Sequence, residues 1–305
     1  MTVTTSTVAG AGGIGLAVYE RNIEAEETVV LIHGYPDNHR VWEPVADRLA
    51  DRFHVVTYDV RGAGASEVPD EVEAYGLPLL AADFRAVVSA TVPEGRQVHL
   101  VGHDWGSLQG WDFVCDERCV DLIASYTSIS GPNLDAVGEF MHRGGAEPPQ
   151  LSTVLRQALK SWYVMAFQIP GLAPRYWRSS MVAKSWPEYL AKVEGVPQGA
   201  IPVGEELRQC QADGANGVNL YRANMMTKMR RPRRVHTDIA VQVVVPLRDR
   251  YVSPALAESV VGLCDDLVFR QVDAGHWVVL SDPDSIAEWI AEHVDRVDAG
   301  RSSAE

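Results

Sequence analysis

The stretch that decides the fold is Val101-Gly102-His103-Asp104-Trp105-Gly106-Ser107. An apolar run, Val98 to Val101, leads into it, and Leu108 to Val120 follows with the apolar spacing of a helix. We therefore expect a strand, a sharp turn of the form Gly-x-Asp-x-Gly, and a helix. A turn of this kind holds its central side chain, here Asp104, at the end of the strand, where it can meet a ligand.

Short β-branched runs alternate with helical patterns along the rest of the chain. Strands are expected at Thr28–Ile32, His54–Tyr58, Val98–Val101, Leu122–Ile129, Val241–Val245 and Leu267–Val272. Helices are expected at Trp42–Leu49, Leu79–Ala90, Leu108–Val120, Pro254–Leu263 and Pro283–Val294. Apolar runs separated by helices indicate an α/β fold, with a mainly parallel sheet flanked by helices on both sides. Polar clusters follow these strands, and sites in such sheets gather at the carboxyl ends of the strands.

The region 134–234 breaks this alternation, because it is rich in Trp, Met, Tyr, Pro and Arg. Helical patches are expected in it at Leu155–Phe167 and Trp186–Val193. We interpret the region as a helical lid inserted between two core strands, and the end of the chain as a frayed tail or linker. The predicted units are a core (1–133 and 235–297), a lid (134–234) and a tail or linker (298–305).

Composition narrows the class of protein. A chain of 305 residues that is 46% hydrophobic can bury a sizeable core. A net charge of −14 argues against a nucleic-acid partner, because phosphate contacts need clustered cations. No apolar run reaches the roughly 18–20 residues that span a membrane. Residues 1–15 lack a basic segment followed by a long apolar one, so we expect no signal peptide and a cytoplasmic location.

Three further features are interpreted as structural. The cysteines Cys115, Cys119, Cys210 and Cys264 have no framework or metal-ligand spacing, so we expect free thiols. Gly10 to Gly15 matches G-x-G-x-x-G, but no helix follows, so we expect a hairpin turn and no dinucleotide site. The basic run Lys228 to Arg234 is interpreted as a solvated loop from lid to core, with contact to an anionic membrane or another domain as the alternative.

Three side chains stand in an informative order. Asp104, Asp249 and His276 each lie just beyond a predicted strand. A lone aspartate can simply cap a helix. Here, however, nucleophile, acid and histidine follow one another in the chain order of the α/β-hydrolase fold, which predicts a catalytic triad.

The loop His33-Gly34-Tyr35-Pro36 follows the first long core strand. In this fold the oxyanion hole uses the backbone N–H after the nucleophile, here Trp105, and one from this loop, for which we expect Tyr35. His33, Gly34 and Pro36 are expected to support the loop.

Together, His-Gly-Tyr-Pro, Gly-His-Asp-Trp-Gly, the Asp249 loop and Gly275-His276-Trp277 resemble the α/β-hydrolase epoxide hydrolases and haloalkane dehalogenases over nearly the whole chain. In epoxide hydrolases two lid tyrosines hold the epoxide oxygen, and the segments around Tyr163 and Tyr221 resemble the two that carry them. Dehalogenases hold the halide with a tryptophan beside the nucleophile and a second donor, often Asn. Trp105 meets the first need, but Tyr35 stands where many dehalogenases carry that Asn.

The resemblance therefore implies an epoxide hydrolase that makes a vicinal diol through an aspartyl ester, with no cofactor and no metal. The alternatives are a haloalkane dehalogenase and a binding module without catalysis. An apolar lid suggests a lipophilic epoxide. The chain also resembles the hydrolase half of actinobacterial fusions to a short-chain dehydrogenase, which implies a fused or associated dehydrogenase; a homodimer is left open. The apolar lid residues are Phe140, Met141, Met165, Phe167, Trp177, Met181, Met225 and Met226.

Overall fold

The computed structural model of the protein describes residues 2–144, 157 and 160–302. In this part of the chain, eight strands form one sheet in the order β1-β2-β4-β3-β5-β6-β7-β8. Strands β1 and β2 run antiparallel to their neighbours, and all other pairs are parallel, which confirms the predicted mainly parallel sheet. The strands are β1 (Thr4–Ala9), β2 (Gly15–Arg21), β3 (Thr28–Ile32), β4 (His54–Tyr58), β5 (Val98–His103), β6 (Ile123–Ile129), β7 (Ala240–Pro246) and β8 (Leu267–Val272).

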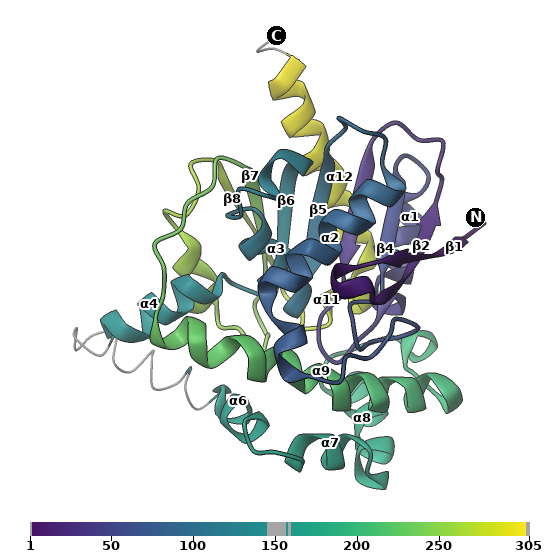
Figure 1. The fold of residues 1–305 in the computed structure, drawn as a ribbon, viewed down its shortest axis with the longest axis vertical. Coiled ribbons are helices and arrows are strands. Elements are labelled where there is room, and N and C mark those ends of the chain that lie inside the picture. Colours follow the sequence, from purple (N-terminus) through teal and green to yellow (C-terminus); the bar gives the residue numbers. More distant parts are fainter. Residues whose placement is uncertain (1, 145–156, 158–159, 303–305) are drawn as a thin grey trace.

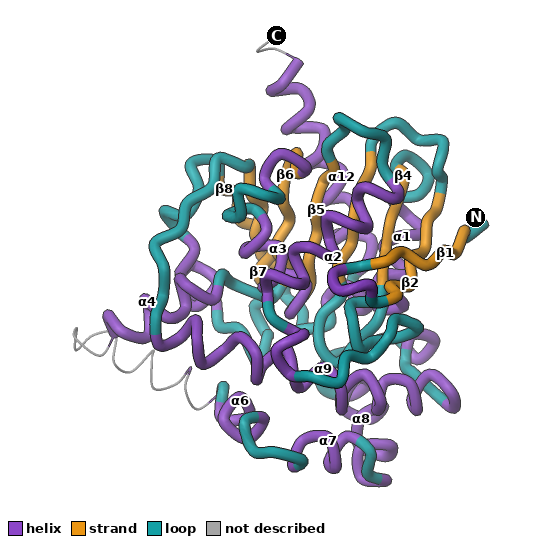
Figure 2. Tube along the Cα trace, viewed as in Figure 1, coloured by secondary structure: helices purple, strands orange, loops and turns teal. Residues whose placement is uncertain are grey.

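Helices cover both faces of the sheet (Figures 1 and 2). The alternating side chains of β3 explain why, since Val30 and Ile32 pack into one apolar cluster, and Val29 and Leu31 pack into another. Helices α2 (Leu77–Thr91) and α3 (Trp105–Phe113) contribute to the first cluster. The second cluster contains side chains of α1 (Glu43–Leu49), α11 (Val278–Ser281) and α12 (Pro283–Ser302).

The N-terminal glycine run is a hairpin turn, as predicted. Strands β1 and β2 are joined by a short 3-10 segment (Ala11–Gly13). Gly12 and Gly13 have φ values of 77° and 80°, which favour glycine at this turn.

Three predicted helix ends were wrong, and the first is that of α10 (Pro254–Ala257), which ends before Leu263. Helix α3 ends at Phe113, not Val120, because Asp116 turns the chain by accepting the N–H of Arg118; Cys115 and Cys119 therefore lie after the helix, and both are free thiols. The predicted tail is helical as far as Ser302, where α12 ends. Buried Val294 and Val297 keep this helix against the core. Residues 303–305 lie outside the described residues.

A helical insertion separates β6 from β7, as predicted. It lies at the carboxyl edge of the parallel strands (Figure 1). The N-terminal part of the predicted patch Leu155–Phe167 lies largely outside the described residues, and its end forms α6. The second patch, Trp186–Val193, belongs to α8. The helices are α4 (Leu134–Gly144), α6 (Trp162–Phe167), α7 (Leu172–Trp177), α8 (Ser180–Lys192) and α9 (Gly204–Arg230).

Helix α9, which the sequence did not predict, is bonded to the core along its length. Asp213 accepts hydrogen bonds from Asn38 Nδ2 (2.8 Å) and from the N–H of Gly64 (2.9 Å). Further along, buried Asn224 accepts the N–H of Leu77 and donates to the carbonyl of Tyr75, both at 2.9 Å. Two side chains of α9 thus fix the helix to neighbouring segments of the core.

The basic run is not simply a solvated loop. Lys228 lies on α9 and donates to Asp112 (2.5 Å) and to buried Asp135 (2.7 Å). Arg233 also pairs with both carboxylates, although its own side chain is largely exposed. The sequence prediction was wrong for Lys228 because the partners lie about a hundred residues away in the chain. In the described part of the chain, no helix is both long enough and apolar enough to cross a bilayer.

Candidate active site

Asp104 sits at the tip of a sharp turn between β5 and α3. Its φ of 51° and ψ of −118° are unusual for a residue with a side chain. Glycine is needed on both sides of it: a Cβ on Gly106 would lie 2.0 Å from the Ile32 carbonyl oxygen, and one on Gly102 would lie 2.4 Å from that of Gly106. The two glycines let β5, β3 and α3 approach closely, and the turn then presents the Asp104 carboxylate above the sheet.

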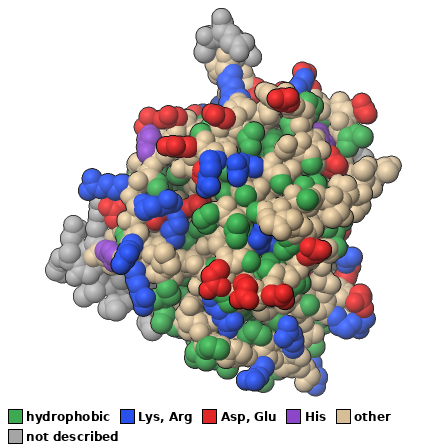
Figure 3. Space-filling model, in the orientation of Figure 1, with side chains coloured by type: hydrophobic (Ala, Val, Ile, Leu, Met, Phe, Trp, Pro, Cys, Tyr) green, Lys and Arg blue, Asp and Glu red, His purple; other side chains and the backbone are tan. Residues whose placement is uncertain are grey.

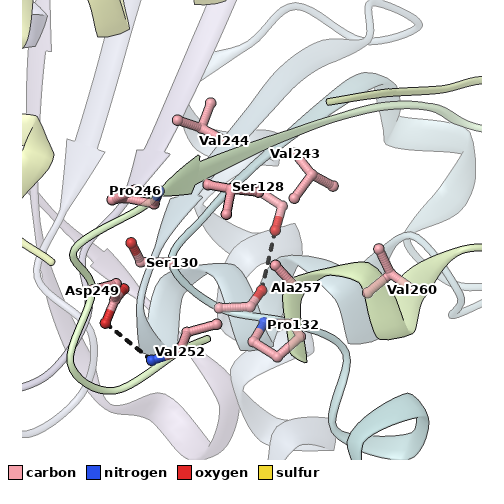
Figure 4. Close-up of a pocket in the computed structure, with 12 residues that line it drawn as sticks. Ser128, Ser130, Pro132, Val243, Val244, Pro246, Asp249, Val252, Ala257 and Val260 are labelled. Carbon is pink, nitrogen blue, oxygen red and sulfur yellow. Dashed lines mark hydrogen bonds between the residues drawn. The ribbon is translucent and has the colours of Figure 1, made fainter. Parts of the chain in front are cut away.

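The structure brings Asp104, His276 and Asp249 together at the carboxyl edge of the sheet. His276 Nε2 lies 3.5 Å from Asp104 Oδ2, and its Nδ1 lies 2.8 Å from Asp249 Oδ2. Asp249 Oδ1 accepts the N–H groups of Tyr251 (2.7 Å) and Val252 (3.0 Å). Figure 4 shows the Val252 bond, on the loop after β7, beside a small cavity of about 10 Å³. Two backbone donors therefore orient the carboxylate that orients the imidazole.

The three groups set one another's charge. Burial disfavours protonated His276, but the Asp249 and Asp104 carboxylates outweigh it and raise the pKa of the imidazole well above its usual value. Burial likewise raises the pKa of Asp249, yet His276 and the backbone N–H groups outweigh it and hold that pKa below its usual value. The resting site thus favours an imidazolium between two carboxylates.

The loop after β3 contacts the Asp104 carboxylate directly. The N–H of Tyr35 donates to Asp104 Oδ1 at 2.7 Å. Gly34 permits this approach, since a Cβ there would lie 2.4 Å from that of Asp104. His33 bonds to two backbone groups near the loop: its Nδ1 donates to the Gly34 carbonyl, and its Nε2 accepts the N–H of Val60, both at 2.9 Å. The other predicted donor, the Trp105 N–H, belongs to the first residue of α3.

A cavity of about 600 Å³ lies above Asp104 and His276. Tyr163 from α6 and Tyr221 from α9 both line it, with ring centroids 6.0 Å apart. Burial, together with the Asp104 carboxylate, raises the pKa of both phenols, so they remain protonated at neutral pH. The structure therefore places two phenol donors and the carboxylate on one cavity.

Among the described residues, the cavity wall is largely aromatic and contains no methionine. Of the eight apolar lid residues singled out in the sequence, only Phe167 and Trp177 line it. Met165 and Met181 are exposed on the outside of the insertion. The remaining aromatic wall consists of Tyr35, Trp162, Tyr176, Trp186, Tyr189, Tyr251 and Trp277.

Sequence reasoning missed Glu194, which is buried directly behind His276. Its Oε2 accepts the N–H of His276 at 2.6 Å, and its Oε1 accepts the Tyr189 hydroxyl at 2.7 Å. The Tyr189 hydroxyl also lies 3.0 Å from that of Tyr251. Gly275 makes room, since a Cβ there would lie 2.3 Å from Glu194 Oε2. In the sequence, Gly275 indicates that another group approaches closely beside His276, but it does not show that this group is Glu194.

Half-buried Asp37 and buried His103 are two further groups that the sequence did not assign. Asp37 accepts the indole N–H of Trp277 at 2.9 Å, and burial raises the pKa of its carboxyl to about 7. Burial lowers the pKa of His103 to about 4, and its Nε2 bonds the His276 carbonyl at 2.9 Å. Both therefore brace the segment that carries His276.

Metal-ligand atoms come together elsewhere in the described residues. The two groups are Glu27, His99 and Asp298, and His236, Asp238 and Asp265. Neither group lines the cavity above Asp104. The chemistry of that cavity rests on carboxylates, an imidazole and phenols.

The sheet, the turn at Asp104 and the order of the three polar residues define an α/β-hydrolase. Residues 29–289 match the model of the Alpha/beta hydrolase family, and the chain belongs to that family.

Among its relatives, "Probable oxidoreductase EphD" of Mycobacterium tuberculosis is 33% identical over 298 residues, which are 95% of this chain and 49% of EphD. "Epoxide hydrolase A" of the same organism is 31% identical over 170 residues, 55% of this chain and 49% of the relative. The chain thus spans about half the length of these curated relatives. The predicted likeness to the hydrolase half of a longer protein is confirmed.

Two solved structures share the fold at 20% sequence identity. The epoxide hydrolase of Bacillus megaterium has a TM-score of 0.75 and covers 96% of this chain and 100% of its own. That of Vigna radiata has a TM-score of 0.73, with 96% and 98% covered. The predicted likeness to epoxide hydrolases of this fold is confirmed at the level of structure.

Proposed function

We propose that this α/β-hydrolase converts a lipophilic epoxide to a vicinal diol through an ester on Asp104. The observation that carries the proposal is that Tyr163 and Tyr221 line the same cavity as Asp104 and His276. A carboxylate beside a histidine suits attack on carbon, and a pair of protonated phenols suits an oxygen leaving group. The relatives named epoxide hydrolases support the same assignment.

In the first step, an Asp104 oxygen bonds to a ring carbon of the epoxide while the bond from that carbon to oxygen breaks. The electron pair stays on the leaving oxygen, which takes a proton from a phenol. Tyr163 and Tyr221 are suited to this role because their raised pKa keeps them protonated. The Tyr35 N–H, bonded to Oδ1, holds the carboxylate so that Oδ2 faces His276.

The second step hydrolyses the ester. Once Asp104 is esterified, it loses the charge that helps to raise the pKa of His276. The imidazolium then gives its proton to the phenolate that the first step left, and the neutral imidazole, oriented by Asp249, becomes a base for water. Water attacks the Asp104 carbonyl carbon while His276 takes its proton, and the N–H groups of Tyr35 and Trp105 hold the oxyanion. The bond from that carbon to the ester oxygen then breaks, His276 returns the proton to this oxygen, and the diol leaves. Esterification itself therefore prepares the base.

One observation favours a second function. The buried indole N–H of Trp105 lies beside the Tyr221 phenol and meets no other acceptor among the described residues, and a halide site would require such a donor. A dehalogenase also needs a second donor, and the Tyr35 hydroxyl is occupied by the Gly214 carbonyl at 2.9 Å. The epoxide hydrolase therefore remains the better assignment.

A single turnover in ¹⁸O-water, with enzyme in excess over a lipophilic epoxide such as an epoxidised fatty acyl ester, tests the proposal. We expect the label in the Asp104 carboxylate, found by mass spectrometry of the peptide, and none in the first diol. Label placed directly in the diol would refute the ester. Halide release from a haloalkane would support the dehalogenase, and binding without turnover would support a module without catalysis.

We further propose that the chain works beside a dehydrogenase, fused or associated. EphD is named a probable oxidoreductase, and about half of its length lies outside the match. Co-purification of hydrolase and nicotinamide-dependent alcohol oxidation in one particle would support this. Separation of the two activities on gel filtration of the native protein would count against it.

A further inference from the structure

The outer side of α6, α7 and α8 exposes an unusual number of large apolar side chains. Fourteen such side chains are exposed in the described part of the chain, and six of them lie within residues 162–181. Each of the six is 48–68% exposed, whereas the core beneath is buried. Scattered apolar residues are normal on a protein surface, but a concentrated patch marks an interaction site. The six, which we call the lid apolar face, are Trp162, Met165, Ile169, Leu172, Tyr176 and Met181.

The same segment is basic in an acidic protein. Residues 148–187 contain no Asp or Glu, although the chain has a net charge of −14. Arg175, Arg178 and Lys184 are exposed there, and none forms an ion pair with another described residue. Figure 3 shows basic and hydrophobic side chains along the lower edge of the molecule, where α6–α8 lie in Figure 1. Residues 162–187 on this side thus combine apolar and positive groups and contain no acid, and the exposed Glu188 that follows them is paired with Lys192.

Half of the lid apolar face also lines the cavity. Trp162, Leu172 and Tyr176 are exposed and at the same time line the space above Asp104. Helices α6 and α7 lie on the side of α9 that faces away from the sheet (Figure 1), and α8 packs against the core through Leu190. A ligand that enters past these three side chains comes from the side of the molecule that is apolar and basic.

We propose that the lid apolar face docks on the surface of an anionic lipid bilayer. Apolar and aromatic side chains can enter the boundary between headgroups and acyl chains, while cations beside them pair with anionic headgroups. An acidic protein is repelled by such a surface, but salt screens charges beyond about 8 Å. A face that has cations and lacks acids can therefore approach it. Docking would place the mouth of the cavity against the lipid.

This surface deepens the proposed function, on which its consequence for substrate rests. A lipophilic epoxide dissolved in the bilayer would enter the cavity without crossing water. Docking itself is independent of the chemistry, so vesicle binding can be measured without turnover. Binding without diol formation would refute the proposed reaction alone, and diol formation without binding would refute the docking alone.

Flotation with lipid vesicles tests the proposal. Vesicles of phosphatidylcholine with 30% phosphatidylglycerol are compared with phosphatidylcholine alone, at 0.1 M and 0.5 M NaCl. We expect the intact chain to float with the anionic vesicles at low salt, and at least fivefold less of it with neutral vesicles or at high salt. No flotation under any of these conditions would overturn the proposal.

Two variants separate the contributions, and neither changes a residue that lines the cavity. Met165→Ser/Ile169→Ser/Met181→Ser removes apolar area, and Arg175→Glu/Lys184→Glu reverses charge; each should reduce flotation at least fivefold. The matched controls are Ile23→Ser/Val68→Ser/Val261→Ser, exposed elsewhere, and Arg230→Glu/Arg234→Glu in the other basic run. The controls should float like the unmodified chain, and all variants should keep its melting temperature.

Two outcomes would contradict docking. Equal losses in the controls and in the face variants would show that the net charge of the chain, and not this face, governs binding. The face could instead cover a second copy of the chain: light scattering would then show a dimer that the apolar triple variant dissociates, with no flotation of the unmodified chain.

Discussion

Two parts of the cavity are held in place by different interactions. We call Asp104, His276 and Asp249 at the edge of the sheet the floor, and the aromatic residues Tyr163, Phe167 and Tyr221 of the helical insertion the roof. On the floor, hydrogen bonds fix each reacting group: backbone N–H groups hold Asp249 and Asp104, and His276 lies between the two carboxylates. In the roof, aromatic rings pack against one another. The ring centroid of Tyr221 lies 4.9 Å from that of Phe167 and 6.0 Å from that of Tyr163. Polar bonds set position and charge, so in the proposed reaction the floor carries out the attack. Ring packing sets the shape of the cavity and buries the phenols, so in the same proposal the roof protonates the group that leaves.

The largest expected effect comes from the floor. Asp104→Asn removes the nucleophile, and we expect kcat for diol formation to fall by on the order of 10⁴-fold or more. Asparagine tolerates positive φ, so the melting temperature should stay close to that of the unmodified protein. The measurement is the initial rate with a lipophilic epoxide. Activity above one hundredth of the original would show that the floor does not supply the nucleophile.

The roof should contribute next. Tyr163→Phe/Tyr221→Phe leaves the ring packing intact but removes both acids, and we expect the rate of ester formation to fall by about 10²–10⁴-fold. Rapid-quench mass spectrometry of the ester on Asp104 gives this rate. The matched control is Tyr176→Phe, whose hydroxyl belongs to a ring at the cavity mouth and should cost less than about twofold. Equal effects of the two variants would contradict an acid role for the roof.

A smaller effect should come from the group that joins floor and roof. Glu194→Gln weakens the acceptor of the His276 N–H and of the Tyr189 hydroxyl, and we expect a loss of about 1–3 kcal/mol in the free energy of unfolding. Chemical denaturation measures it. The matched control Glu188→Gln, on the exposed side of α8, should change stability by less than about 0.5 kcal/mol.

The smallest expected effect is a change in the pKa of His276. In Asp104→Asn a neighbouring negative charge is lost, so the pKa of His276 should fall, because that carboxylate helps to raise it. Nitrogen-detected NMR titration of the imidazole measures the shift. An upward shift would contradict the proposed preparation of the base by ester formation.

The sequence predicts the floor of the cavity better than the roof. Strands such as β3 are apolar on both faces, so composition alone identifies them. The residues of the triad follow strands, and parallel strands bring their carboxyl ends to one edge. Local pattern and fold topology therefore place Asp104, Asp249 and His276 without knowledge of any distant contact.

The resemblance pointed to Tyr163 and Tyr221, but periodicity alone predicts less of the roof because its helices are short or polar. Helix α6 has six residues, too few for periodicity to show that Tyr163 faces the cavity while Met165 faces outward. Helix α9 contains Gly214 and Gly217, which lower helix propensity, and it buries Asp213 and Asn224 through bonds to distant loops. The place of Glu194 likewise depends on a distant contact, the hydrogen bond from the N–H of His276.

The hydrogen bonds between α9 and the core bear on how substrate enters the cavity and how product leaves it. Asp213, Asn224, Lys228 and the carbonyl of Gly214 all have partners in the core, so raising this helix would break several polar contacts together. Trp162, Leu172 and Tyr176 are exposed and line the cavity, so we expect substrate to enter and product to leave past them. Passage between these side chains becomes a step that can limit turnover.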